Sequence, residues 1–201
     1  MFWKKNDSNI KDLENRLMDS EAELSFIHSQ LDPVLANAVY QQSDINLDDK
    51  KCFNTYQATL LKIEFGSLWP IQQEIDCLGR YLQLYKKFVN SEIVYKSDFN
   101  ISDIDLNIPS LLLFPIVRNA LQNGYHSKEN YPVNIKLKIG GNNLHFEVSN
   151  RVNHYLGNQG ENKIIQRLES RLNQLYVSDY NLFINSNSNL FKISLILHLK
   201  K

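Results

Sequence analysis

The sequence predicts an α+β protein in two parts: an N-terminal helical module over residues 1–89 and an α/β sandwich over residues 90–201. Through most of the first 89 residues, apolar side chains recur at steps of three and four, which is typical of helices. After Asn90, several segments alternate between apolar and polar residues as strands do, and helical segments separate them. Strands with interspersed helices and terminal hairpins indicate two layers, one mixed sheet and one layer of helices.

The first expected helix covers residues 10–31 and ends at Asp32-Pro33, because proline removes a hydrogen-bond donor and clashes with the preceding turn. Its apolar residues form a heptad seam that is broken at Ser20: Ile10, Leu13, Leu17, Leu24, Ile27 and Leu31. On a helix this polar, a narrow seam favours a parallel coiled coil with a second helix. Packing of the seam onto the chain's own domain is the alternative.

The remaining elements follow from periodicity and from turn residues. Further helices are expected at residues 34–40, 53–65 and 71–88, with a polar connector at 44–51 and a break at 66–70. In the second part we expect a strand at 92–96, a helix from 111 to about 124, a hairpin of 134–139 and 144–148, a helix at 162–176, and strands at 181–184 and 190–199.

Composition excludes several classes of partner. The chain has 22 basic and 22 acidic residues, so no excess charge favours nucleic acid or an anionic membrane. Cys52 and Cys77 are too few for a disulfide framework and suit a reducing cytosol. The sequence shows neither a signal peptide nor an apolar run of about 18 residues, so we expect a cytoplasmic protein without a membrane span.

Four segments in order carry a resemblance to a known family. Residues 23–34 read ELSFIHSQLDPV, residues 70–88 read PIQQEIDCLGRYLQLYKKF, residues 108–124 read IPSLLLFPIVRNALQNG and residues 167–176 read RLESRLNQLY. They are similar to E-L-x-x-L-x-x-Q-I-N-P-H, L-x-x-E-I-x-x-L-x-x-Y-L, I-P-P-L-L-L-Q-P-L-V-E-N-A-I-K-H-G and N-V-x-x-R-L-x-x-L-Y of LytS-type sensor histidine kinases. The resemblance covers roughly residues 24–199 and implies a dimerising helical module followed by a GHKL-type ATP-binding domain.

The resemblance implies a catalytic site whose central residues are replaced here. The family carries its phosphoacceptor histidine directly after Asn-Pro, and this chain has Val34, which cannot accept phosphate. In the family's Glu-Asn-Ala box the Glu is the general base, whereas Arg118 stays protonated and cannot take that role. The box keeps Asn119, the expected Mg²⁺ ligand, and Asn123 follows one turn later as a second expected nucleotide contact.

The glycines and the adenine-binding residue of the family are changed as well. Its D-x-G-x-G segment falls on residues 148–153, where Asn150 keeps a carbonyl acceptor for adenine but no glycine follows. Its second glycine box, G-x-G-L-x-N, falls on residues 162–167, which contain no glycine, and Gly157 and Gly160 lie earlier. Acceptor, base and phosphate-binding glycines are therefore all altered.

Three functions remain open on the sequence. The leading hypothesis is a degenerate histidine-kinase-like protein of two-component signalling, a dimeric adaptor or regulator that pairs with itself or a genuine kinase, or occupies a response regulator. The second is a module that binds ATP or ADP with Mg²⁺ as a ligand, through Asn119 and Asn150. The third is an atypical active kinase, for which His28 is the local candidate acceptor, although it lies about 240° around a helix from Val34.

Overall fold

The computed structural model describes residues 2–101, 106–125, 131–154, 162–177 and 179–199, and side chains from residue 9 onward. The helices are α1 (Phe2–Gln30), α2 (Pro33–Gln41), α3 (Leu47–Leu60), α4 (Ile71–Phe88), α5 (Phe114–Asn123) and α6 (Lys163–Tyr176). The strands are β1 (Leu68–Pro70), β2 (Tyr95–Ile101), β3 (Asn107–Pro109), β4 (Gly124–Tyr125), β5 (Val133–Gly140), β6 (Asn143–Val152), β7 (Tyr180–Ser186) and β8 (Leu190–His198). The predicted α+β class is confirmed.

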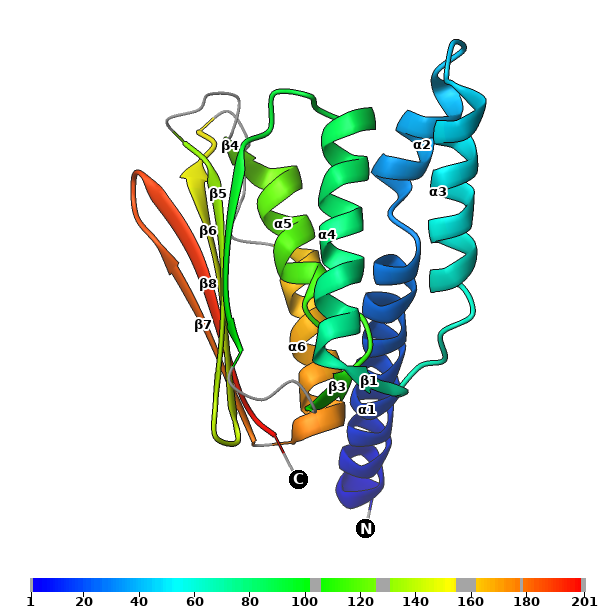
Figure 1. Cartoon of the computed structure of the whole chain (residues 1–201). Coiled ribbons are helices and arrows are strands. Elements are labelled where there is room, and N and C mark those ends of the chain that lie inside the picture. Colours follow the sequence, from blue (N-terminus) through cyan, green and yellow to red (C-terminus); the bar gives the residue numbers. More distant parts are fainter. Residues whose placement is uncertain (1, 102–105, 126–130, 155–161, 178, 200–201) are drawn as a thin grey trace.

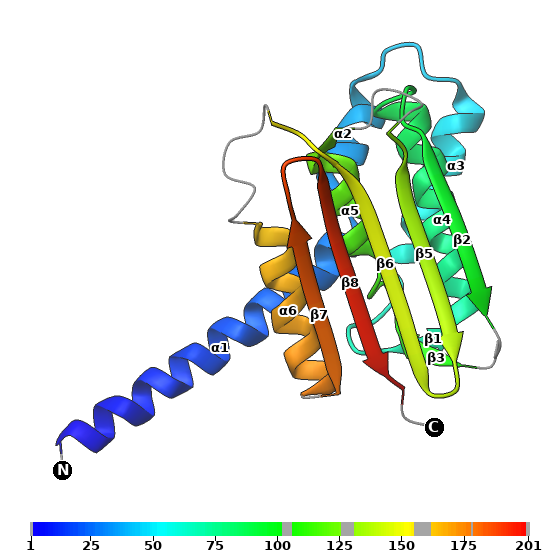
Figure 2. The same ribbon diagram turned by 90° about the vertical axis from the view of Figure 1, so that its left-hand side faces the viewer.

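One mixed sheet with the strand order β2-β5-β6-β8-β7 forms one side of the molecule (Figures 1 and 2). β2 and β5 run parallel, the other neighbours are antiparallel, and the short β4 pairs with β6. Alternate residues of β5, from Val133 to Ile139, are buried, while Lys136 and Lys138 between them are exposed. The sheet therefore packs one face against helices, as the alternation predicts.

The helices lie in two ranks beside the sheet (Figure 1). α4, α5 and α6 are next to it, and α1, α2 and α3 lie on the side of these helices away from the sheet. Buried residues from both predicted parts, for example Phe53 and Phe146, belong to one continuous hydrophobic core. The boundary near residue 90 stays a prediction. No helix in the described part of the chain is long and apolar enough to cross a membrane.

Several element starts differ from the sequence prediction, and α1 begins at Phe2 where the first helix was expected from residue 10. α3 begins at Leu47 inside the expected connector, because the Asn46 side chain accepts a hydrogen bond from the Asp48 N–H and caps the helix. β2 begins at Tyr95, where its parallel pairing with β5 starts. α5 begins at Phe114, not at Leu111, because residues 110–113 form a turn that is held by other elements.

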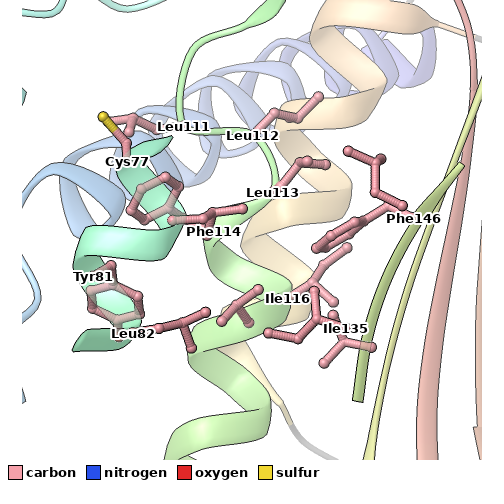
Figure 3. Close-up of a cluster of buried hydrophobic side chains, with 14 of the residues drawn as sticks. Cys77, Tyr81, Leu82, Leu111, Leu112, Leu113, Phe114, Ile116, Ile135 and Phe146 are labelled. Atoms are coloured by element: carbon pink, nitrogen blue, oxygen red, sulfur yellow. The ribbon is translucent and has the colours of Figure 1, made fainter. Parts of the chain in front are cut away.

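This turn is fixed by a buried network that joins α4 to α6. Glu74 of α4 is fully buried and its carboxylate accepts hydrogen bonds from Trp69 Nε1 (2.8 Å), Leu111 N (2.7 Å) and Leu113 N (2.8 Å). Arg171 of α6, also fully buried, donates to the carbonyl oxygens of Leu111 (3.1 Å) and Ser110 (2.6 Å). Figure 3 shows the turn from Leu111 to Phe114 between α4 and the core.

The seam of α1 is left open in the single chain. The exposed fractions of Ile10, Leu13 and Leu17 are 54%, 61% and 63%, and the first half of α1 projects beyond the rest of the molecule (Figure 2). α1 instead buries Ala22 and Phe26, and it packs along α6. The coiled coil stays a prediction, but most of the seam is exposed in the single chain, and of its residues only Leu24 is partly buried.

We expect the buried network to make stability depend on pH. Burial raises the pKa of Glu74 to about 7 from an ordinary value of 4.5, against the lowering effect of its N–H donors. A raised pKa means that this group stabilises the fold fully below pH 4.5, and that up to about 3 kcal/mol is lost as the pH rises through 7. Urea unfolding at pH 5 and pH 8 measures this difference.

The variant Glu74→Gln should remove that pH dependence and lower the free energy of unfolding at pH 5 by about 1–3 kcal/mol, because its amide cannot accept all three N–H bonds. Glu64→Gln, at an exposed glutamate, is the matched control and should leave both quantities unchanged. Parallel pH profiles for the wild type and Glu74→Gln would contradict the assignment.

Candidate functional site

The structure brings the three predicted asparagines together. Asn119 and Asn123 come from α5 and Asn150 from β6, and with Phe191 and Asn162 they line a cavity of about 10 Å³. That volume is at the lower limit for a single water molecule. As it stands, the cavity has no room for a nucleotide.

The oxygen of Asn119 that would bind Mg²⁺ already has two partners. Asn119 is 1% exposed, and its Oδ1 accepts hydrogen bonds from Asn123 Nδ2 (2.7 Å) and from Asn162 Nδ2. A carbonyl oxygen has two lone pairs, so both are used. Asn162 is also the N-cap of α6, where its Oδ1 accepts from the Ile164 N–H. A metal ion at Asn119 would have to displace at least one of these amides.

Asn150 keeps an unused acceptor. Its Nδ2 donates to the Arg151 carbonyl (2.9 Å), while its Oδ1 is buried and has no hydrogen-bond partner among the described residues. Gly124 lies against this side chain: a Cβ at Gly124 would be 2.5 Å from the Ala120 oxygen and 2.7 Å from Asn150 Nδ2. Only glycine fits there without displacement. The acceptor expected to recognise adenine is therefore present but enclosed.

The residues at the expected phosphoacceptor position connect helices. Val34 lies in the first turn of α2, is 41% exposed and offers no reactive group. Asp32, which falls on the Asn of the family's Asn-Pro-His, is buried and accepts from Tyr81 Oη (2.5 Å), Gln122 Nε2 (3.3 Å) and Val34 N (2.8 Å). Burial and this neighbouring carboxylate raise the pKa of Tyr81, so its phenol remains a donor. Asp32 thus links the α1–α2 junction to α4 and α5.

Two arginines hold α1 against α5 and α6. Arg118 donates from Nη1 to the His28 carbonyl (2.6 Å). Arg167 of α6 donates from Nε to Glu21 Oε2 (2.6 Å), and its Nη1 lies 3.3 Å from His28 Nδ1. We call Arg118, Arg167, Glu21 and His28 the arginine clamp. Burial, Arg118 and Arg167 lower the pKa of His28, so its ring is neutral at pH 7.

Sequence reasoning named some of these residues but not their contacts. Asn162 and Arg167 were placed in the second glycine box without a role, and Asp32 only in the helix break. An asparagine just before an apolar helix signals an N-cap, which could have singled out Asn162. Gly157 and Gly160 lie outside the described residues. Within the described part of the chain, no cluster of three or more His, Cys, Asp and Glu side chains could hold a metal ion.

Comparisons with known proteins give similar structures only. No family model and no curated protein matches the sequence. The Acinetobacter baumannii histidine kinase AdeS matches at 6% identity and a TM-score of 0.48, over 77% of each chain. The histidine kinase domain of the Erythrobacter litoralis EL346 blue-light activated histidine kinase matches at 14% and 0.48, over 90% of this chain and 96% of that one. A histidine kinase from Burkholderia phymatum STM815 matches at 10% and 0.45, over 94% and 99%.

At such low identity and TM-score, these likenesses carry no statement about activity.

We expect the arginine clamp to protect the second half of α1. Replacing Arg118 and Arg167 together by alanine should speed amide hydrogen exchange in residues 21–30 about five- to tenfold, because each part-exposed contact contributes about 1 kcal/mol or less. Hydrogen-exchange mass spectrometry of the full chain measures this. Arg16→Ala, on the projecting part of α1, is the control, and equal exchange in both variants would contradict the clamp.

Proposed function

We propose that the chain is a degenerate LytS-type, histidine-kinase-like protein that does not autophosphorylate and acts as a dimeric adaptor or regulator in cytoplasmic two-component signalling. The observation that carries this proposal is the closed site around Asn119. The Asn119 oxygen that was expected to bind Mg²⁺ accepts hydrogen bonds from two side-chain amides, and the adjoining cavity measures about 10 Å³.

The contrast between retained and replaced residues supports the proposal. Glu74 and Arg171 fall on the Glu and Arg of the family's second and fourth segments, and both are buried in the network that shapes the start of α5. At four replaced positions, the side chains make contacts between elements: Asp32, Arg118, Asn162 and Arg167. Two residues that build the scaffold match the family, and four that differ from it connect parts of the fold.

The chain also lacks two groups that phosphoryl transfer needs, a nucleophile and a base. Transfer needs a nucleophile in line with the phosphoryl group and a carboxylate or equivalent for its proton. Val34 supplies no nucleophile, and Arg118 is engaged with the His28 carbonyl and cannot act as a base. His28 has a neutral ring, but Arg167 lies against its Nδ1.

Nucleotide binding without transfer is the second candidate function. The buried, unpartnered Asn150 Oδ1 favours it, because an unsatisfied buried acceptor costs about 1–3 kcal/mol and an adenine amino group would relieve that cost. Binding would require Asn162 to leave Asn119. In this case ATP or ADP with Mg²⁺ would be a regulatory ligand.

We infer that the partner is a second copy or a genuine histidine kinase that pairs along α1, with a response regulator as a further docking partner. The open seam of Ile10, Leu13 and Leu17 supports pairing, because three large apolar side chains on one projecting helix stay exposed in the single chain.

Incubation of the purified chain with radiolabelled ATP and Mg²⁺ should yield no acid-labile phosphohistidine. Val34→His should also stay unlabelled, because the base and the open metal site are still missing. Label on the wild-type chain would overturn the proposal, and its loss in His28→Gln would then identify His28 as the acceptor.

The exposed seam of α1 predicts that the chain forms a dimer in solution. Light scattering after size exclusion should give twice the chain mass for the wild type, and the chain mass for Leu13→Glu combined with Leu17→Glu, because two buried carboxylates per helix oppose pairing. Leu47→Glu, at an α3 leucine that is 82% exposed, is the control and should remain dimeric. A monomeric wild type would contradict self-association through α1.

A further inference from the structure

A second, much larger cavity lies between α3 and α4, away from the asparagine site. It measures about 610 Å³, and residues of these two helices line it. Its nearly buried apolar residues are Tyr56 on α3 and Leu84 and Phe88 on α4, which are 6–7% exposed. We call it the α3–α4 cavity. Its volume is in the range of small-molecule sites, about 300–1,000 Å³.

The sequence of α3 explains why this space is not filled. α3 buries its large apolar residues Phe53, Tyr56 and Leu60 in the hydrophobic core. The α3 side chains that line the cavity include Cys52 and Thr55, which are too short to reach across to α4. A ligand with an apolar part would therefore fill space that the side chains of α3 and α4 leave open, and would contact the remaining free surface of Tyr56, Leu84 and Phe88.

The charges around the cavity leave one cation in excess. Lys87 and Asp49 pair across it at 2.6 Å and neutralise each other. Of the other lining residues, Arg80 and Lys51 make no salt bridge with any described residue, and Asp48 lies in the first turn of α3, where a carboxylate is stabilised by the helix N-terminus. Arg80 offers a planar set of donors that matches a carboxylate.

We propose that the α3–α4 cavity binds an amphipathic organic monoanion, a carboxylate with an apolar chain or ring. Arg80 binds the carboxylate, and Tyr56, Leu84 and Phe88 contact the apolar part. This inference does not depend on the proposed function. A bound ligand would join α3 to α4, the helix that carries both Glu74 and Tyr81.

The thiol of Cys52 can report whether the α3–α4 cavity is occupied. Cys52 is exposed and lines the cavity, whereas Cys77 is buried in α4. The experiment measures the rate at which N-ethylmaleimide alkylates Cys52 in the full chain, by peptide mass spectrometry, with and without octanoate as the probe. At octanoate concentrations about ten times its Kd, alkylation should be about tenfold slower, because only the unoccupied fraction reacts.

Two variants and a second probe make the test specific. Octylammonium, which has the same chain and the opposite charge, should not protect Cys52. Arg80→Gln should abolish protection by octanoate, while Arg16→Gln should retain it. Thr55→Trp should fill the cavity and remove the effect of octanoate, with Cys77 remaining slow to react as a check that the variant is folded.

The proposal is overturned if octanoate fails to slow alkylation of the wild type, if octylammonium protects equally well, or if Arg80→Gln is protected like the wild type. None of these outcomes bears on phosphoryl transfer, so the cavity and the proposed function are tested separately.

Discussion

Leu111 has a backbone φ of 58°, a value that residues other than glycine rarely adopt, and Glu74 and Arg171 hold it there. Strain of this kind costs about 1–3 kcal/mol and persists only where surrounding contacts determine it. Here the Glu74 carboxyl group of α4 and the Arg171 guanidinium of α6 bond to the N–H and carbonyl groups of one turn. Because this turn leads directly into α5, it sets the direction in which Arg118 and Asn119 point.

From α5, the adjacent side chains of Arg118 and Asn119 point in different directions, because consecutive helix residues lie about 100° apart. Asn119 faces β6 and the N-terminus of α6, where its oxygen is occupied, and Arg118 faces α1, where it bonds to the His28 carbonyl. Arg167, five residues after Asn162, bonds to α1 from α6. Through these contacts α1 and α6 are fastened to α5 and to each other. This fixed arrangement is the structural basis of the proposed adaptor function.

Periodicity in the sequence predicted the elements whose bounds depend on nearby residues alone. Residues 71–88 were predicted to form a helix and do so without a shift, because their apolar face is strongly periodic. The start of α5 was missed because Leu111 is held by Glu74, which is 37 residues away in the sequence. The family resemblance singled out Asn119, Asn123 and Asn150 as nucleotide contacts, and the structure places all three around one small cavity. The bond from Asn162, 43 residues from Asn119, has no signal in local spacing.

Isothermal titration of ATP with Mg²⁺ into the wild type and into Asn162→Gly tests the closed site most directly. Glycine removes the amide that occupies Asn119 and is tolerated as an N-cap at a cost of a few tenths of a kcal/mol. The account predicts no saturable heat for the wild type and saturable binding for Asn162→Gly, which is lost again when Asn119→Ala is added. Micromolar binding by the wild type would contradict a closed site and make nucleotide occupancy the switch instead.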